Sequence, residues 1–321
     1  MKKNDYFLHF IIISSAELGQ RVDNFLLKNF KSVPKSRIYC LIRKGAVLVN
    51  KKIIKPKYKL QIGDELRIPH IRNYNNKNSI FYYNNINKVS TLIDAIIYED
   101  DYLLAINKPA GTVVHGCSGI NFGIIESMRF LRPDLHFLEL VHRLDRDTSG
   151  VLLLAKKRSS LHSLHKQLRI KGVKKNYIAL VRGKWKSNIK IVTVPLLKNN
   201  SAKGENIVHI NNAGKQSETR FKVAEIFTFA TLVNINPITG RTHQIRVHSN
   251  YAGHPIAFDD RYGDIKFNKK IKECGLNRLF LHAKSISFKH PYNGKILIIE
   301  APIDDILNKC LMNLRNYYKD Q

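Results

Sequence analysis

The chain is poor in acidic residues, in cysteine and in long apolar runs. Its 321 residues include 25 Asp and Glu against 54 Lys and Arg, which gives a formal net charge of +29. The four cysteines, Cys40, Cys117, Cys274 and Cys310, form no Cys-x-x-Cys pair, so neither a zinc site nor a disulfide framework is predicted. This cysteine usage favours a reducing, cytoplasmic location.

No stretch approaches the roughly 20 apolar residues that a membrane helix needs. The apolar run near the start, residues 10–13, is short, and Asp5, Tyr6 and His9 interrupt the sequence before it. We therefore expect a first strand there rather than a signal peptide, and we expect no contact with a membrane.

Motifs for nucleotide and hydrolytic chemistry are also missing. Residues 116–119 lack the flanking strand and helix that a phosphate-binding glycine loop needs, and no Gly-x-Ser-x-Gly elbow occurs. His243 and His248 lie five residues apart, which places them on different faces of a helix, and no Cys or carboxylate completes a ligand set. The sequence therefore predicts neither a nucleotide cofactor nor a metal site.

What the chain has in abundance is positive charge. No fold requires a net charge of +29, and a bound polyanion would offset its self-repulsion, so nucleic acid is the expected partner. A genome biased toward Lys, Asn and Ile would also raise the lysine count, but it would not order arginines in clusters. A composition of 44% hydrophobic and 25% charged residues is typical of a globular protein, and the length suffices for two domains.

Residues 1–72 form the first predicted domain. Apolar spacing predicts helices over residues 20–30 and after Ser36, a hairpin over residues 46–54 and a strand over residues 65–68. The domain has 16 basic and 5 acidic residues. Its cations concentrate on and just after the second helix, where they suit phosphate contacts: Lys35, Arg37, Arg43 and Lys44. A solvated helix face is the alternative interpretation.

Residues 73–90 are rich in Asn, Tyr and Lys without periodicity, and we interpret them as a flexible linker to a second domain, residues 91–321. In that domain a dense polar run, HRLDRDTSG at residues 142–150, opens directly onto five apolar residues, 151–155, which predict a buried strand. Charged groups are thereby placed at the rim of a core. A solvated loop with local ion pairs would explain the same composition.

Two further segments place polar side chains at strand ends. Residues 107–111, NKPAG, leave Lys108 at the end of a predicted strand, where Pro and Gly fix a turn. Residues 174–183, KKNYIALVRG, place Tyr177 beside another predicted strand. An ordinary aromatic residue of a sheet would fit this position as well.

The last motif is PITGRTHQIRVH at residues 237–248. The preceding strand turns at Gly240, and Thr242 is the predicted N-cap of a helix that runs to Ala252 and stops at Gly253.

Together these motifs resemble the RluA-type family of pseudouridine synthases. The run HRLDRDTSG is similar to the active-site signature of that family, NKPAG to its first motif and GRTHQIRVH to its third. The first domain is similar to the S4 RNA-binding domain that precedes many such synthases. The resemblance implies an α+β fold, in which a small S4 domain precedes a catalytic domain with a mixed, mostly antiparallel sheet.

The resemblance also implies roles for individual residues. Asp145, which follows the Arg-Leu pair, would be the catalytic nucleophile. Arg246 would pair with it, and its guanidinium could orient the carboxylate through two hydrogen bonds. Tyr177 would line the active site, where its ring could stack on an extruded uracil or its hydroxyl could move a proton.

On the substrate side we expect Arg143, Lys108 and Arg241, in addition to the cations of the first domain. Arg143 could support the displaced strand or a phosphate, and the alternative is a simple ion pair with Asp147.

The implied reaction moves uracil from an N1 to a C5 glycosidic bond without net redox change, so no cofactor is expected. Residues 137–141 and 251–260 are similar to family members that act on the large ribosomal subunit. This similarity implies that a monomeric enzyme acts on 23S ribosomal RNA, either free or in a large-subunit assembly intermediate.

Three other functions remain open. A synthase for transfer RNA or for other ribosomal sites would share all three motifs. A non-catalytic RNA-binding protein of ribosome assembly would need only the positive charge and the first domain. A metal-dependent nuclease is the weakest alternative, because no carboxylate cluster can be assembled from the sequence.

Overall fold

The computed structural model describes residues 8–30, 33, 35–69, 91–116, 123–186, 188–200 and 206–317. The chain divides into two units, Met1–Val89 and Ser90–Gln321. The expected linker, residues 73–90, lies outside the described residues, so its bounds stay a prediction. Within the described residues, no helix has the length and apolar character needed to cross a membrane.

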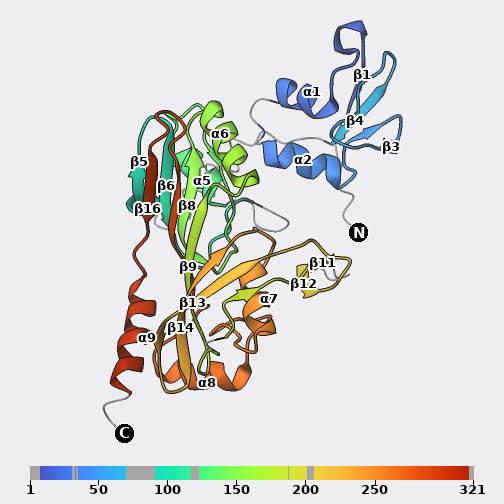
Figure 1. Ribbon diagram of the computed structural model, residues 1–321. Coiled ribbons are helices and arrows are strands. Elements are labelled where there is room, and N and C mark those ends of the chain that lie inside the picture. The colour runs from blue at the N-terminus through green and yellow to red at the C-terminus, as the bar shows by residue number, and fades with distance from the viewer. Residues whose placement is uncertain are drawn as a thin grey trace, which may run out of the picture. The chain divides into compact units, whose positions relative to one another are not determined.

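The first unit combines two helices with a four-stranded sheet in the order β1-β4-β2-β3. All of the strand pairings described in it are antiparallel. Its elements, blue to cyan in Figure 1, are β1 (Leu8–Ile12), η1 (Ser15–Glu17), α1 (Val22–Asn29), α2 (Lys35–Arg43), β2 (Leu48–Val49), β3 (Lys52–Ile53) and β4 (Glu65–Pro69). The two helices, the hairpin and the last strand that the apolar spacing predicts are all present.

A buried carboxylate ties the two helices of this unit together. Asp23 of α1 is fully buried and accepts hydrogen bonds from Arg21 Nε at 3.0 Å and from the Tyr39 hydroxyl at 2.7 Å. Burial alone would raise the pKa of Asp23, but these two donors hold it below its usual value. Ile38 and Ile42 complete the attachment of α2 by packing into the core, so the opposite face of α2 stays in solvent.

The second unit is built on a ten-stranded sheet. Its longest path of paired strands has the order β10-β13-β14-β9-β15-β8-β6-β5, with β16 beside β15 and β7 beside β8. The strands are β5 (Ile96–Glu99), β6 (Leu103–Lys108), β7 (Glu139–Leu140), β8 (Ser149–Ala155), β9 (Lys174–Arg182), β10 (Ile191–Val192), β13 (Thr219–Ile226), β14 (Ala230–Pro237), β15 (Leu281–Lys289) and β16 (Ile296–Glu300). A separate ribbon consists of β11 (Leu196–Asn200) and β12 (Asn206–Ile210).

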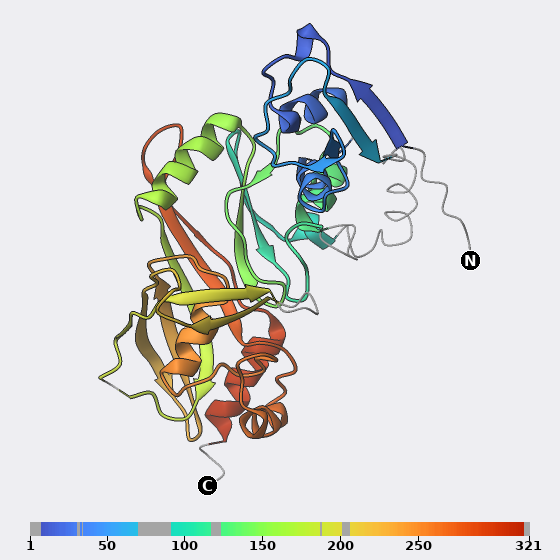
Figure 2. The ribbon, with the colours of Figure 1, turned by 90° about the vertical axis from the view of Figure 1, so that its right-hand side faces the viewer.

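Five labelled helices cover this sheet: α5 (Ile124–Leu131), α6 (Arg158–Arg169), α7 (Gln244–Tyr251), α8 (Ile265–Glu273) and α9 (Asp305–Asn316). The helices α5 and α6 pack on opposite faces of β6 and β8. Across β9 and β14, α7 packs on one face and the pair α8 and α9 on the other, as Figures 1 and 2 show. The expected α+β class and the mixed, mostly antiparallel sheet are confirmed.

The strand β8 is apolar at consecutive positions because both of its faces are covered. Leu152 and Leu154 point into a core with Met128 of α5, whereas Val151 and Leu153 lie on the side of α6. A strand that is covered by helices on both faces does not need a polar residue at every second position. This explains why the run after the polar motif reads as five apolar residues.

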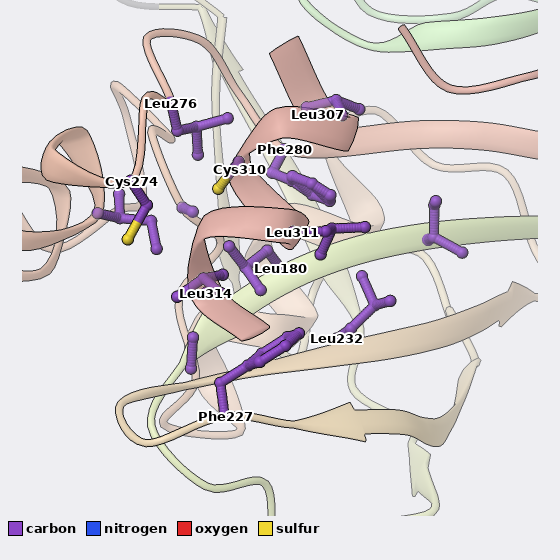
Figure 3. Close-up of a cluster of buried hydrophobic side chains, with 14 of the residues drawn as sticks. Leu180, Phe227, Leu232, Cys274, Leu276, Phe280, Leu307, Cys310, Leu311 and Leu314 are labelled. Atoms are coloured by element: carbon purple, nitrogen blue, oxygen red, sulfur yellow. The ribbon is translucent and has the colours of Figure 1, made fainter. Parts of the chain in front are cut away.

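The largest core cluster lies under α8 and α9, at the other end of the sheet. Leu311 and Leu314 of α9 pack with Leu180 of β9, Leu232 of β14 and Phe280 (Figure 3). Cys274 and Cys310 belong to this cluster as free thiols, and burial raises the pKa of Cys310 to about 12. These two cysteines are therefore packing residues of the core.

The two halves of the sheet meet where β8 and β15 pair, which is the one parallel pairing among the described strands. Gly150 opposes Ala283 there, with a φ of 108°, and an added Cβ would lie 2.2 Å from the Ala283 carbonyl oxygen. Beside it, Ser149 Oγ lies 2.9 Å from Nδ1 of His282, and Nε2 of His282 lies 3.0 Å from the Ala301 carbonyl oxygen. Only glycine fits this junction.

Gly150→Ala should reduce the free energy of unfolding by about 3 kcal/mol, because a positive φ costs an alanine roughly 1–2 kcal/mol and overpacking adds a similar amount. Gly253→Ala is the matched control, since Gly253 has a φ of 83° and nothing within 4 Å of an added Cβ. Urea unfolding of both variants measures the difference. Equal losses in the two variants would show that the contact with Ala283 is unimportant.

Candidate active site

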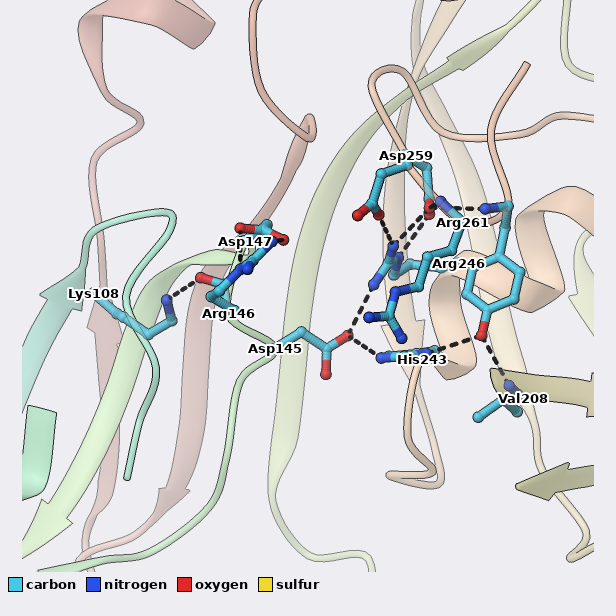
Figure 4. Close-up of polar contacts among 11 residues, drawn as sticks. Lys108, Asp145, Arg146, Asp147, Val208, His243, Arg246, Asp259 and Arg261 are labelled. Carbon is cyan, nitrogen blue, oxygen red and sulfur yellow. Dashed lines mark hydrogen bonds and ion pairs between the residues drawn. The ribbon is translucent and has the colours of Figure 1, made fainter. Parts of the chain in front are cut away.

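Asp145 lies in the loop that joins β7 to β8, just before the parallel junction. Its side chain is 27% exposed, and Oδ2 faces Arg246 Nη1 at 3.8 Å and His243 Nε2 at 3.9 Å (Figure 4). Both distances exceed the roughly 2.9 Å of a normal hydrogen bond, so the two contacts are electrostatic. A partly exposed carboxylate beside a buried cation is an arrangement that a substrate can approach.

Arg246 on α7 supplies that cation. Its side chain is 4% exposed, and it donates to the fully buried Asp259 from Nε at 2.7 Å and from Nη2 at 2.6 Å. Nη2 also contacts Asp260 at 2.9 Å, and the guanidinium lies 5.3 Å from the centre of the Tyr262 ring. Burial lowers the pKa of Arg246, but the hydrogen bonds to Asp259 raise it by more, so the group stays charged.

The expected ion pair of Arg246 with Asp145 is present, but the two hydrogen bonds expected within it need a correction. The two parallel hydrogen bonds go to Asp259, and Asp145 receives only the 3.8 Å approach of Nη1. Asp259 accepts these two bonds because its carboxylate is already held in place by the backbone N–H groups of Arg261 and Tyr262, each at 3.0 Å from Oδ1. The bonds from Arg246, with smaller contributions from these two N–H groups, hold the pKa of Asp259 below its usual value although burial would raise it.

The helix that carries Arg246 begins one residue later than Thr242 predicts. Its N-cap is His243, whose φ of 51° lies in the left-handed region and whose side chain makes no capping bond. Gln244 fixes the turn instead, since its Oε1 accepts from Arg241 N at 3.0 Å and from Thr239 Oγ1 at 2.7 Å. The predicted stop at Gly253 follows the C-cap, with a φ of 83°.

Tyr177 lies in β9 with its ring partly buried among core residues on both sides of the junction. Burial and, to a smaller degree, the negative charge of Asp145 raise the pKa of Tyr177 above its usual value. The hydroxyl therefore stays protonated at neutral pH and lies within electrostatic range of Asp145. The structure thus gathers Asp145, Tyr177 and Arg246 from three distant segments.

Lys108 does not lie where a substrate contact requires it. Its side chain is fully buried, and Nζ donates to the carbonyl oxygens of Pro109 at 2.9 Å, Thr112 at 2.7 Å and Arg146 at 2.8 Å. Burial lowers the pKa of Lys108 to about 7, and in the protonated form its three protons match these three carbonyl oxygens, so all of its donors are used. Lys108 instead fastens the loop that contains Asp145 to the turn after β6, as Figure 4 shows for Arg146.

Arg143 and Arg241 both reach solvent. The guanidinium of Arg143 has no hydrogen bond or ion pair within the described part of the chain, because Asp147 pairs with Arg146 at 3.0 Å. Arg241 donates to the Gln216 carbonyl oxygen at 3.2 Å and meets no carboxylate among the residues described. Both remain available to a polyanion.

The four cations of the first unit lie on the solvent face of α2 and just after it. Lys35, Arg37, Arg43 and Lys44 are exposed, and the described residues provide none of them with an ion pair. Lys35 lies 6.0 Å from the centre of the Tyr39 ring.

The structure adds three residues to the site that the sequence did not single out as site residues: His243, Asp259 and Tyr262. Nδ1 of His243 lies 2.9 Å from the Tyr262 hydroxyl, which in turn accepts the N–H of Val208 at 2.9 Å. For His243 the sequence did contain a signal, because this residue lies in the same motif as Arg246. Among the described residues, no group of three or more His, Cys, Asp or Glu is placed to hold a metal ion.

Comparison with known proteins agrees with this geometry. Residues 102–251 match the RNA pseudouridylate synthase family, and residues 20–66 match the S4 domain. The ribosomal large subunit pseudouridine synthase C of Escherichia coli strain K12 is 58% identical over 318 residues, which cover 98% of this chain and 99% of that protein. The protein of that name from Haemophilus influenzae is 57% identical, and the match covers 95% of this chain and 94% of that protein.

A solved structure, human RNA pseudouridylate synthase domain containing 4, aligns with 73% of this chain and 98% of its own. Its TM-score is 0.61 and its sequence identity 26%. The chain therefore belongs to the family of RNA pseudouridylate synthases and has an S4 domain at its N-terminal end.

Proposed function

We propose that this pseudouridine synthase isomerises specific uridines of 23S ribosomal RNA, with Asp145 as the nucleophile. The substrate follows from relatives that are 58% identical over nearly the whole chain and whose name assigns them to the large ribosomal subunit. We further propose that the enzyme acts as a monomer in the cytoplasm, on free RNA or on an assembly intermediate. A synthase for other RNA sites is the alternative, and mapping pseudouridines in a deletion strain separates the two.

The chemistry requires one nucleophile and no redox group. Uracil has to leave the N1 glycosidic bond, turn and rejoin the sugar through C5, and a carboxylate can hold the sugar or the base covalently meanwhile. The observation that carries the assignment is the position of Asp145, which combines partial exposure with a buried, permanently charged guanidinium 3.8 Å away. Attack on the sugar and attack on the base use the same carboxylate.

Arg246 and Tyr177 support the nucleophile in different ways. Because Arg246 is fixed by Asp259, its remaining Nη1 is a preorganised positive charge beside the carboxylate of Asp145. Tyr177 offers a flat ring and a protonated hydroxyl to a uracil that has been extruded from folded RNA.

Sequence-independent contacts to the RNA backbone come from the exposed cations. Arg143 is adjacent to the catalytic loop, and Arg241 precedes α7 in the same unit. The S4 domain contributes the four cations of α2 and the residue after it, and these supply affinity rather than choice of uridine.

Asp145→Asn should abolish isomerisation, with at least about a 1000-fold loss, because an amide is a poor nucleophile of nearly the same size. The assay uses 23S transcript with tritium at C5 of uridine, since formation of the C5 bond releases this hydrogen to water. Asp147→Asn is the matched control: Asp147 lies in the same loop, and among the described residues its hydrogen bonds are to the exposed Arg146 side chain, so we expect turnover within about threefold of wild type. Tritium release by Asp145→Asn at the wild-type rate would refute the nucleophile.

Arg246→Lys should lower kcat by about 100-fold and change KM by less than about threefold, because lysine retains the charge but cannot make two parallel bonds to Asp259 while it faces Asp145. The same release assay gives both constants. Arg220→Lys, at an exposed pair with Glu218, controls for the substitution itself. An unchanged kcat in Arg246→Lys would contradict the role of the buried cation.

The double substitution Arg37→Ala and Arg43→Ala should weaken RNA binding about tenfold at physiological salt and reduce the slope of log K against log salt by about 1.5, as expected for two lost phosphate contacts. The control removes two exposed lysines of α8, Lys266 and Lys269, and leaves the charge of α2 intact. Filter binding at several salt concentrations measures both variants. Equal weakening by the two pairs would mean that only the overall charge matters.

A further inference from the structure

A chain of polar contacts ends on the same oxygen of Asp145 that Arg246 faces. It begins at the backbone N–H of Val208 in β12, passes through the Tyr262 hydroxyl at 2.9 Å to Nδ1 of His243 at 2.9 Å, and reaches Asp145 from Nε2 at 3.9 Å. Figure 4 shows the dashed contacts along this path. The proposed function assigns no role to His243 or Tyr262.

The first member of the chain has a fixed direction, because a peptide N–H can only donate, so the Tyr262 oxygen accepts from Val208. With one lone pair of the hydroxyl used in this way, its own hydrogen can be donated to Nδ1 of His243, which lies 2.9 Å away, and this is the arrangement on which the proposal below is built. A neutral imidazole that accepts at Nδ1 carries its proton on Nε2. Burial, together with the charge of Arg246, lowers the pKa of His243, whereas the charge of Asp145 raises it.

The backbone of His243 is held in an uncommon conformation. Its φ of 51° lies in the left-handed region, where Asn and Asp are tolerated better than most side chains. Gln244 fixes this turn with its two acceptor bonds to Thr239 and Arg241 and by donating to the Glu218 carbonyl oxygen at 2.9 Å. Such conformations are retained where the surrounding structure holds them, and they cluster at functional sites.

We propose that His243 is a positioning residue for the catalytic carboxylate: its Nε2–H, oriented by Tyr262, donates to Oδ2 of Asp145 beside Arg246 and leaves Oδ1 to attack. The proposal rests on Asp145 being the nucleophile. His243 and Arg246 both approach the Asp145 carboxylate at Oδ2, and none of the described residues makes a hydrogen bond to Oδ1. Closing the 3.9 Å gap to hydrogen-bond length needs a shift of about 1 Å, which substrate binding can supply.

A neutral donor differs from a second cation in what it does to the nucleophile. Arg246 already supplies a full positive charge, and another charge would lower the electron density on the carboxylate further. A neutral N–H fixes the rotation of the carboxyl group with a smaller effect on that density. His243 keeps its proton throughout, so the bonds made and broken at the uridine are unchanged by its presence.

Two substitutions of His243 separate positioning from a purely structural role. In His243→Gln the side-chain amide reaches the place of Nε2, whereas in His243→Asn it reaches only the place of Nδ1. The left-handed backbone favours Asn over Gln. We expect kcat to fall by less than about tenfold in His243→Gln and by at least about 100-fold in His243→Asn, with KM changed by less than about threefold in both. If His243 only shaped the turn, Asn would be the better replacement, and that result would overturn the proposal.

A spectroscopic measurement tests the tautomer without relying on turnover. In the full-length protein labelled with ¹⁵N-histidine, the ¹⁵N shifts of His243, assigned by their loss in His243→Gln, should show an unprotonated Nδ1 and a protonated Nε2. Tyr262→Phe should mix the two tautomers and lower kcat about tenfold, and His162→Gln on the exposed face of α6 should change neither readout. A wild-type Nδ1–H would overturn the proposal. Absence of tritium release by the wild type would instead refute the proposed function, while the ¹⁵N shifts still decide the tautomer.

Discussion

The parallel pairing of β8 with β15 is the constraint on which the catalytic unit depends. One half of the sheet, with α5 and α6, carries the loop of Asp145, and the other half, with α7, carries Arg246. The two halves approach at the backbone of Gly150 and Ala283, where a side chain at position 150 has no room. Because the loop and the helix both flank this junction, its spacing determines how far the carboxylate lies from the cation.

Buried charges then fix the parts that flank the junction. The ammonium of Lys108 holds the loop through three carbonyl oxygens, and Asp259 holds the guanidinium of Arg246 through two parallel bonds. A buried charge without a partner is costly, so each of these groups keeps its partners and its position. The carboxylate of Asp145 is partly exposed, and this division between fixed cations and a reachable carboxylate suits the proposed reaction on an extruded nucleotide.

The motifs singled out Asp145, Arg246 and Tyr177, which the fold brings together, but the hydrogen bonds of Lys108 and Arg246 differ from those that the motifs predict. Lys108 reads as a substrate contact because Lys beside Pro and Gly at a strand end suggests an exposed turn, and the fold buries it instead. Arg246 does face Asp145, but its two parallel hydrogen bonds go to Asp259, and no sequence pattern shows that Asp259 is held ready by two backbone N–H groups. Backbone carbonyl oxygens take the hydrogen bonds of Lys108, and a carboxylate held by backbone N–H groups takes those of Arg246; sequence spacing describes neither.

By itself the sequence determined the two kinds of unit, the positive charge that calls for nucleic acid, and the segments that carry the chemistry, because apolar periodicity and local motifs are properties of short stretches. Only the tertiary structure decided which of those side chains meet. The bonds of Gln244 that hold the left-handed turn at His243, the bond between Val208 and Tyr262 and the two bonds between Arg246 and Asp259 all join residues from different segments. Such contacts follow from how the strands pair and the helices pack, and a pattern along the chain does not contain that information.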